Sequence, residues 1–235
     1  DLFITGASGV LRVFQNIGTR FNMNLSERTT NFAALASICS GYSVPALALG
    51  DWNGDGAADI VVGGSSGTVR ILSSTANFNA PQTFAVNYAL TSGSTAAIPA
   101  LGDLNGDGRK DLLLLLADGT VNLYTNTGSA TVPFTDPPAI VNLLGTPVVN
   151  GTGLAVADIN YDGKPDVLAS DTDGRIWEFY STGGNSFTLM SKVWGGSAVG
   201  LANRLTLTAA DIEGDGDVDV LAGTRSEEHT SELQS

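Results

Sequence analysis

The nine-residue sequence Asp103-Leu-Asn-Gly-Asp-Gly-Arg-Lys-Asp111 occurs four times in the chain with few changes. The other copies begin at Asp51, Asp158 and Asp211, so successive copies start 52, 55 and 53 residues apart. A short apolar stretch precedes each copy and another follows it, for example Leu112–Leu116. Self-similarity at a fixed period of this size predicts a repeat architecture.

A glycine continues the register after the nine residues. It stands eight residues after the last Asp of a copy and directly follows Ser or Asp, at Gly67, Gly119 and Gly174. Such a dipeptide between two apolar runs indicates a β-hairpin turn. Asp1 has Gly9 at the same offset. We therefore interpret Asp1 as the last residue of a fifth copy.

Each repeat contains about four short apolar runs and no sustained helical spacing. Four-stranded units repeated at this period are typical of β-propeller blades. We predict an all-β fold, a β-propeller of four-stranded antiparallel blades that forms a partial ring. Three full blades are expected at about residues 46–97, 98–153 and 154–204, with one partial blade before them and one after them.

The nine residues carry side-chain oxygens at positions 1, 3, 5 and 9 and a glycine at position 6. A cation of calcium size takes six to eight oxygens at about 2.3–2.6 Å. Four side chains and the backbone carbonyl of position 7 supply five or more, and water or a bidentate carboxylate would complete the shell. Asx-turns bring alternate side chains together, and glycine permits the chain reversal. We predict one Ca²⁺ in each complete loop, about four in all.

The predicted metal ligands follow from these positions. They are Asp51, Asn53, Asp55, Ala57 and Asp59; Asp103, Asn105, Asp107, Arg109 and Asp111; Asp158, Asn160, Asp162, Lys164 and Asp166; Asp211, Glu213, Asp215, Asp217 and Asp219; and Asp1. Position 7 (Ala57, Arg109, Lys164, Asp217) contributes its carbonyl. The apolar residue at position 2 (Trp52, Leu104, Ile159, Ile212) is expected to anchor each loop to the core.

Other interpretations of the loops are less favoured. Position 12 is apolar in every copy, which excludes an EF-hand because that loop needs a bidentate Glu there. Magnesium prefers a rigid octahedron with several waters, and zinc lacks its His and Cys ligands. The plain alternative is a set of acidic turns without metal. Thirteen of the 24 acidic residues occupy ligand positions, and four copies in register favour a cation.

Composition excludes several classes of function. The net charge is −13 without a basic cluster, so nucleic-acid binding is not expected. The longest apolar run has six residues, too short for a membrane helix. Cys39 is the single cysteine, and His229 is the single histidine and stands near the end. An internal disulfide and a histidine-based catalytic triad in the body are therefore excluded.

Residues 225–235 differ abruptly in composition from the rest. They read Arg-Ser-Glu-Glu-His-Thr-Ser-Glu-Leu-Gln-Ser. This stretch resembles the in-frame translation of a short-read sequencing adapter; a genuine polar C-terminal tail is the alternative. We expect a propeller fragment over residues 1–224 and a non-native tail over 225–235.

The motif Asp-x-Asn-Gly-Asp-Gly-x-x-Asp between strands resembles the FG-GAP/VCBS repeat family, whose calcium-loop blades occur in integrin α-chain heads and bacterial secreted or surface proteins. The resemblance implies Ca²⁺ ligands at positions 1, 3, 5, 7 and 9, an extracellular location, and further blades that complete a ring. Tyr161 at position 4 and Glu213 at position 3 depart from the pattern. The Phe-Gly and Gly-Ala-Pro elements of the integrin type are absent, so the VCBS-like branch fits better.

We therefore expect a non-catalytic adhesion or recognition module of a secreted or cell-surface protein, with a protein or glycan ligand and structural calcium. One alternative is the propeller part of a polysaccharide lyase or hydrolase, for which the acids outside the loops are Glu27, Asp118, Asp136, Asp171, Asp173 and Glu178. The other is a lectin that stacks sugars on Trp177 or Trp194, although core packing is the simpler role for these side chains.

Overall fold

The computed structural model of the chain describes residues 1–19, 22–74, 82–136, 138–144, 151–183, 186–195, 205–212 and 215–224. The described strands form five sheets. The first contains β1 (Leu2–Thr5), β2 (Leu11–Asn16) and β3 (Leu25–Glu27). The second contains β4 (Pro45–Gly50), β5 (Asp59–Gly64), β6 (Thr68–Ser74) and β7 (Phe84–Thr91). The third contains β8 (Ala97–Gly102), β9 (Asp111–Leu116), β10 (Val121–Tyr124) and β11 (Ala139–Ile140).

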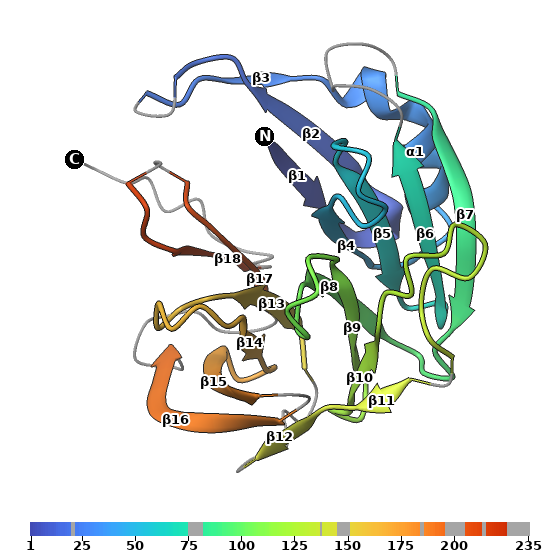
Figure 1. The fold of residues 1–235 in the computed structure, drawn as a ribbon. Helices are drawn as coiled ribbons and strands as arrows, with labels where there is room; N and C mark the ends of the chain where they lie inside the picture. Colours follow the sequence, from blue (N-terminus) through green and yellow to red (C-terminus); the bar gives the residue numbers. More distant parts are fainter. Residues whose placement is uncertain are drawn as a thin grey trace.

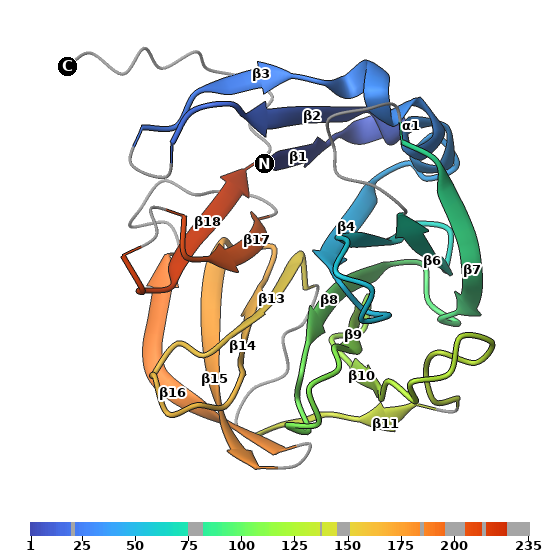
Figure 2. The same cartoon turned by 45° about the horizontal axis from the view of Figure 1, so that its top comes forward.

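The fourth and fifth sheets follow in the same chain order. The fourth contains β12 (Asn142–Leu144), β13 (Gly153–Ala157), β14 (Asp166–Ser170), β15 (Arg175–Gly183) and β16 (Ser186–Gly195). The fifth contains β17 (Leu205–Ala210) and β18 (Asp219–Thr224). The sheets stand side by side around a common centre (Figures 1 and 2), where β4 packs on β8, β8 on β13 and β13 on β17. The predicted all-β class with antiparallel sheets is confirmed.

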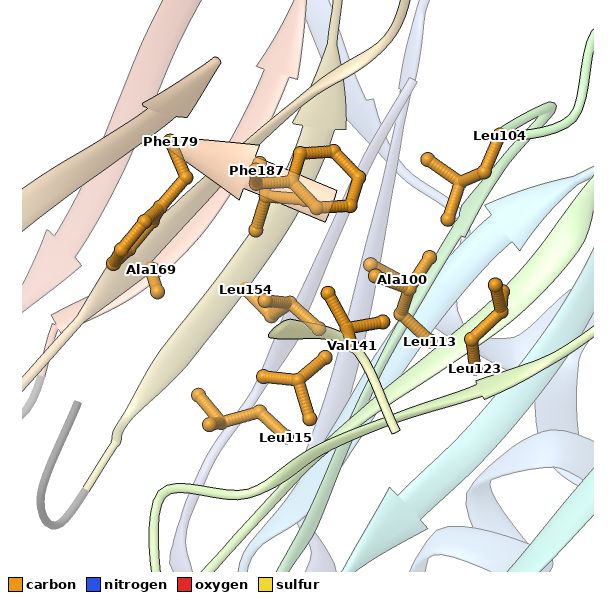
Figure 3. Packing of buried hydrophobic residues seen from close by; sticks show 12 residues of the cluster. Ala100, Leu104, Leu113, Leu115, Leu123, Val141, Leu154, Ala169, Phe179 and Phe187 are labelled. Carbon is orange, nitrogen blue, oxygen red and sulfur yellow. The ribbon is translucent and has the colours of Figure 1, made fainter. Parts of the chain in front are cut away.

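The hydrophobic core lies between neighbouring sheets, and β9 shows why. Its six residues are all buried. Leu112 and Leu114 belong to the cluster shared with the second sheet, whereas Leu113 and Leu115 belong to the cluster shared with the fourth. Side chains alternate between the two faces of a strand, so an unbroken apolar run fits a strand that is covered on both faces. In Figure 3, Leu115 and Val141 meet Leu154 of β13 in the second of these clusters.

Glycines permit both the close approach of β8 to β13 and the tight hairpin turns. A Cβ on Gly102 would lie 2.4 Å from Cγ1 of Val156, so this glycine permits the close approach of β8 to β13. The predicted hairpin turns are confirmed by positive φ at the glycines that sequence register marks, Gly9, Gly67, Gly119 and Gly174.

The expectation that no repeat contains a helix is wrong for the segment after β3. A 3₁₀ turn, η2 (Thr29–Phe32), leads into α1 (Ala33–Cys39), and a second 3₁₀ turn, η1 (Ala7–Gly9), follows β1. Leu35 and Cys39 lie on one buried face of α1 and pack in the cluster between the first and second sheets. The seven residues of α1 contain the four-residue spacing of buried side chains only once. A helix this short therefore leaves no periodic pattern in the sequence. No helix in the described residues has the length and apolarity needed to cross a membrane.

The strand β12 extends the fourth sheet in an unexpected way. It pairs in parallel with β16, while the other strand pairs of the described residues are antiparallel. Because β12 directly follows β11 of the third sheet, the chain contributes to two sheets in succession. The chain therefore passes directly from β11, the outer strand of the third sheet, to β12, the outer strand of the fourth.

Candidate metal sites in the repeated loops

Each nine-residue motif forms the turn between two consecutive antiparallel strands, which are β4 and β5, β8 and β9, β13 and β14, or β17 and β18. The last residue of the first strand pairs with position 9 of the motif, and the pairs are Gly50 with Asp59, Gly102 with Asp111, Ala157 with Asp166 and Ala210 with Asp219. Loops of adjacent sheets contact each other, since Asn126 Nδ2 donates to the carbonyls of Trp52 (2.7 Å) and Lys110 (3.0 Å). The first two loops therefore lie at the same end of their adjacent sheets.

The position-1 carboxylate lies inside the loop and accepts several backbone amides. In the first loop, Asp51 Oδ1 accepts from the amides of Gly54 (2.7 Å) and Asp55 (3.2 Å), and Oδ2 accepts from Gly56 (2.8 Å). Asp103 makes the same three bonds in the second loop. Glycine at positions 4 and 6 has positive φ in both loops, which turns these amides inward. The loop thus orients a carboxylate with its own backbone.

Positions 3, 5 and 7 form two successive Asx-turns. The position-3 Oδ1 accepts from the position-5 amide at 2.8–2.9 Å in the first three loops. The position-5 Oδ1 accepts from the amide of position 7, at Ala57 (2.8 Å), Arg109 (2.9 Å), Lys164 (2.9 Å) and Asp217 (2.8 Å). Alternate side chains consequently fold back against the loop, as the sequence predicts.

The position-9 aspartate begins β5, β9 or β14 and joins the loop to the next strand along the chain, or to the residues just after that strand. Asp59, Asp111 and Asp166 are fully buried. Their Oδ2 accepts from the position-2 amide at 3.4, 3.1 and 3.1 Å. Their Oδ1 accepts from an amide 15 residues later, at Ser74 (2.9 Å), Asn126 (2.8 Å) and Ser181 (2.8 Å). This second set of partners was not predicted, although the constant offset of 15 residues marks it.

Burial sets the electrostatics of position 9. It raises the pKa of Asp59 to about 6, and the neighbouring carboxylates of Asp55 and Asp51 act in the same direction. Burial likewise raises the pKa of Asp111 and of Asp166. Ionising these groups is therefore costly without a nearby positive charge. A divalent cation would favour the carboxylate form.

Positive side chains already contact the position-5 carboxylates of the second and third loops. Arg109 Nη2 lies 2.6 Å from Asp107 Oδ2, and Lys164 Nζ lies 3.8 Å from Asp162 Oδ2. Asn105 Nδ2 also donates to Asp107 Oδ2, at 3.1 Å, so positions 3 and 5 converge. In the described residues, no three Asp, Glu, His or Cys side chains are grouped as a metal site would group them. The all-oxygen donor set fits a hard cation, which would compete with Arg109 and Lys164 for the position-5 carboxylates of the second and third loops.

Family comparison covers most of the chain. A model of the FG-GAP-like repeat matches residues 51–114, 103–169 and 158–222, and each match runs from one loop through the next. The chain belongs to the FG-GAP-like repeat family. No curated protein sequence matches the chain.

FG-GAP-like repeats here adopt a fold found in a solved lectin. The structure, described for specific recognition of non-reducing terminal N-acetylglucosamine by a lectin from Agrocybe aegerita, aligns with a TM-score of 0.52 at 20% sequence identity. The alignment covers 94% of this chain and 60% of the lectin chain. The chain therefore spans about three fifths of that protein's length, and the similarity supports the propeller-like fold.

Asp1 occupies the structural place of a position-9 residue in these FG-GAP-like repeats. The Asn16 amide donates to Asp1 Oδ1 at 2.9 Å, again across 15 residues. The bond reproduces those of Asp59, Asp111 and Asp166, so the sequence register extends to the first residue. Its predicted role as a metal ligand stays a prediction.

The fourth loop of the FG-GAP-like repeats differs from the others. Asp211 accepts from the amides of Asp215 (3.1 Å) and Gly216 (3.0 Å), and Asp219 Oδ2 accepts from Ile212 (2.9 Å). Glu213 lies outside the described residues. The prediction that the position-2 side chain is anchored in the core is confirmed for Trp52 and Leu104, which are 4% and 8% exposed. It is wrong for Ile212, which is 45% exposed. The described part of the fifth sheet has two strands, so less of the sheet covers Ile212.

The acids proposed for an enzyme serve local structure where their bonds are defined. Asp118 Oδ1 accepts from the Thr120 amide at 2.9 Å in a hairpin turn, which lowers the pKa of Asp118. Asp171 Oδ1 accepts from the amides of Asp173 and Arg175, and its Oδ2 accepts from Trp177 Nε1 at 3.0 Å. Trp177 packs partly buried against the cluster between the third and fourth sheets. The side chain of Trp194 and residues 225–235 lie outside the described part.

Proposed function

We propose that the chain is part of a calcium-dependent β-propeller module that recognises a protein or glycan outside the cell and has no catalytic role. Its five sheets correspond to three whole blades and two partial ones in a larger ring. The observation that carries the proposal is the buried position-9 aspartate, which ends an oxygen-lined loop and bonds to a backbone amide 15 residues later in the same sheet or just beyond its strand. A cation in that loop would stabilise the sheet directly.

Charge supports calcium as the occupant. The chain carries a net charge of −13, and the first three loops each hold three carboxylates within nine residues. The position-1 carboxylate is fixed by two to three loop amides, which reduces the entropy lost when a ligand binds. A bound Ca²⁺ would place positive charge beside the buried position-9 carboxylate and favour its ionised form.

Replacing Asp107 by alanine is expected to remove one bound Ca²⁺ per chain. Asp107 contributes one of the three carboxylates of the second loop, and its Oδ1 also holds the Arg109 amide. Equilibrium dialysis against radioactive calcium measures the number of bound ions. The matched control is Asp118→Ala, an aspartate of the same sheet that lies in a turn outside the loops. Equal ion counts in Asp107→Ala and the native chain would argue against the assignment of this loop.

The packed sheets and the loops between their strands support a recognition role. Sheets with apolar cores between them present turns and loops at both ends, where binding residues of such scaffolds commonly lie. The defined bonds of Asp118 and Asp171 are those of turn formers, because the Oδ1 atom of each accepts backbone amides of its own turn. The lectin structure with the same fold has a recognition function according to its title, which supports this role for the present chain.

A glycan is the second candidate ligand, and one cluster favours it. The turn between β14 and β15, at the end of the sheet opposite the metal loop, carries Asp173, whose exposed side chain pairs at 2.7 Å with that of Arg175, the first residue of β15. Trp177 stands next to them and offers a partly exposed indole whose Nε1 is fixed by Asp171. Aromatic faces flanked by polar groups suit sugar rings.

If this cluster binds sugars, Trp177→Ala is expected to lower glycan affinity at least tenfold, because the stacking surface is lost. A glycan array screens for ligands of the native chain, and titration of the best glycan gives the affinity ratio. Circular dichroism checks that the variant is folded, since Trp177 also packs on the core. Loss of binding without loss of fold supports the lectin, whereas unchanged binding excludes this site.

A further inference from the structure

Tyr161 adopts a backbone conformation that its side chain disfavours. It occupies position 4 of the third loop, where the first and second loops have Gly54 and Gly106. Its φ is +60°, close to the +78° and +76° of these glycines. A side chain in this left-handed region brings Cβ against the backbone, so a bulky residue there is strained. Another interaction must account for the conformation.

The third loop also lacks one hydrogen bond that the first and second loops contain. The position-4 amide donates to the position-1 Oδ1 at 2.7 Å in the first loop and 2.8 Å in the second. In the described third loop, Asp158 accepts from Asp162 and Gly163 but not from Tyr161. The Tyr161 amide therefore lacks the bond to the position-1 carboxylate that holds Gly54 and Gly106.

The hydroxyl of Tyr161 reaches the next loop. Its Oη accepts a hydrogen bond from the Val218 amide at 2.9 Å, across 57 residues of chain. Tyr161 is 58% exposed, so burial of the ring does not explain its direction. Val218 is position 8 of the fourth loop, between Asp217, whose amide holds the position-5 side chain, and the position-9 residue Asp219. The bond thus joins the ligand-bearing segments of two loops.

We propose that Tyr161 is a positioning residue that couples the third and fourth loops, so that a divalent cation in one loop raises the affinity of the other. The inference rests on the proposed function, because it requires that both loops bind cations. A cation that orders the third loop fixes Tyr161 and, through Val218, the segment 217–219. The second cation then meets a loop that has already lost part of its freedom, which is positive coupling and is reciprocal.

Hydrogen exchange read by mass spectrometry tests the coupling loop by loop. Calcium is titrated, and the midpoint of protection is read separately for peptides that cover residues 158–166 and 211–219. We expect Asp162→Ala to raise the calcium midpoint of the fourth loop on the order of fivefold. A change of this size corresponds to the net free-energy contribution of one hydrogen bond. In a Tyr161→Phe background, which removes only the acceptor hydroxyl, Asp162→Ala should leave that midpoint unchanged. Tyr180→Phe, a tyrosine in β15 outside the loops, is the matched control and should preserve the fivefold effect.

The outcomes separate the two ideas. If both loops gain protection with calcium but Asp162→Ala shifts the fourth loop equally with and without the Tyr161 hydroxyl, the coupling is overturned and the proposed function stands. If neither loop gains protection at any calcium concentration, the proposed function fails and the coupling with it. In calcium-free protein, Tyr161→Phe should still speed exchange of the Val218 amide; an unchanged rate there also contradicts the coupling.

Discussion

Replacing Asp111 by alanine is expected to lower the free energy of unfolding by about 3 kcal/mol in calcium-free buffer. The carboxylate of Asp111 is fully buried and accepts the amides of Leu104 (3.1 Å) and Asn126 (2.8 Å). These bonds connect the loop before β9 with the residue two places after β10. Truncation to alanine leaves both amides without the acceptor that now satisfies them.

Two opposing effects set the size of the change. Each buried amide left without an acceptor costs about 1–3 kcal/mol. Against this, burial raises the pKa of Asp111, which shows that its charge is held at a desolvation cost that the substitution removes. We therefore place the loss in the lower half of the range of about 2–6 kcal/mol for two amides. For a chain of this size it corresponds to a melting temperature lower by roughly 6–12 °C.

Urea denaturation in the presence of a chelator measures this change without any contribution from metal binding. Asp118→Ala in the same sheet is the matched control, because Asp118 accepts a hydrogen bond from one backbone amide in an exposed turn. This substitution should lower the free energy of unfolding by less than about 1 kcal/mol. Asp111→Asn keeps one carbonyl acceptor and should fall between the two. If Asp111→Ala proves no more destabilising than Asp118→Ala, position 9 does not join the loop to the sheet as described.

Much of the fold could be predicted because the decisive interactions are local. The turns at Gly67, Gly119 and Gly174 need a residue that tolerates positive φ, and the sequence places glycine there at a constant offset. The unbroken apolar run Leu112–Leu116 marks a strand covered on both faces. The Asx-turns of positions 3 and 5 depend on residues two places apart. Each of these features is fixed within a few residues of chain.

The features that were not predicted depend on contacts between distant segments. The parallel pairing of β12 with β16 joins residues more than 40 places apart and leaves no periodic pattern. The bonds of Asn126 to Trp52 and of Tyr161 to Val218 cross between sheets, so neither residue reveals its partner in the sequence. The short helix α1 is stabilised by packing of Leu35 and Cys39 rather than by a long amphipathic pattern.

Removal of calcium is expected to lower the melting temperature of the native chain by at least about 10 °C. A cation that binds the folded loop and not the unfolded chain stabilises by about 2.7 kcal/mol per site at a concentration a hundredfold above its Kd. Extracellular calcium modules have Kd values of about 10⁻⁴–10⁻³ M, so a calcium concentration on the order of 10 mM approaches this condition. Several loops in one cooperative unit add their effects.

Magnesium serves as the control for nonspecific screening of the charge of −13. It has the same charge as calcium but prefers a smaller, rigid octahedral shell, and should therefore stabilise the loops much less at equal concentration. Equal stabilisation by the two ions would indicate screening of the acidic residues rather than binding in the loops.

Differential scanning calorimetry of the native chain, with calcium and with excess EDTA, tests most directly whether a dication in each loop stiffens its sheet. We predict a transition that moves upward by at least about 10 °C with calcium and continues to rise as calcium is added, as mass action requires. A transition at the same temperature in calcium and in EDTA would contradict the claim that calcium bound in the loops stabilises the sheets.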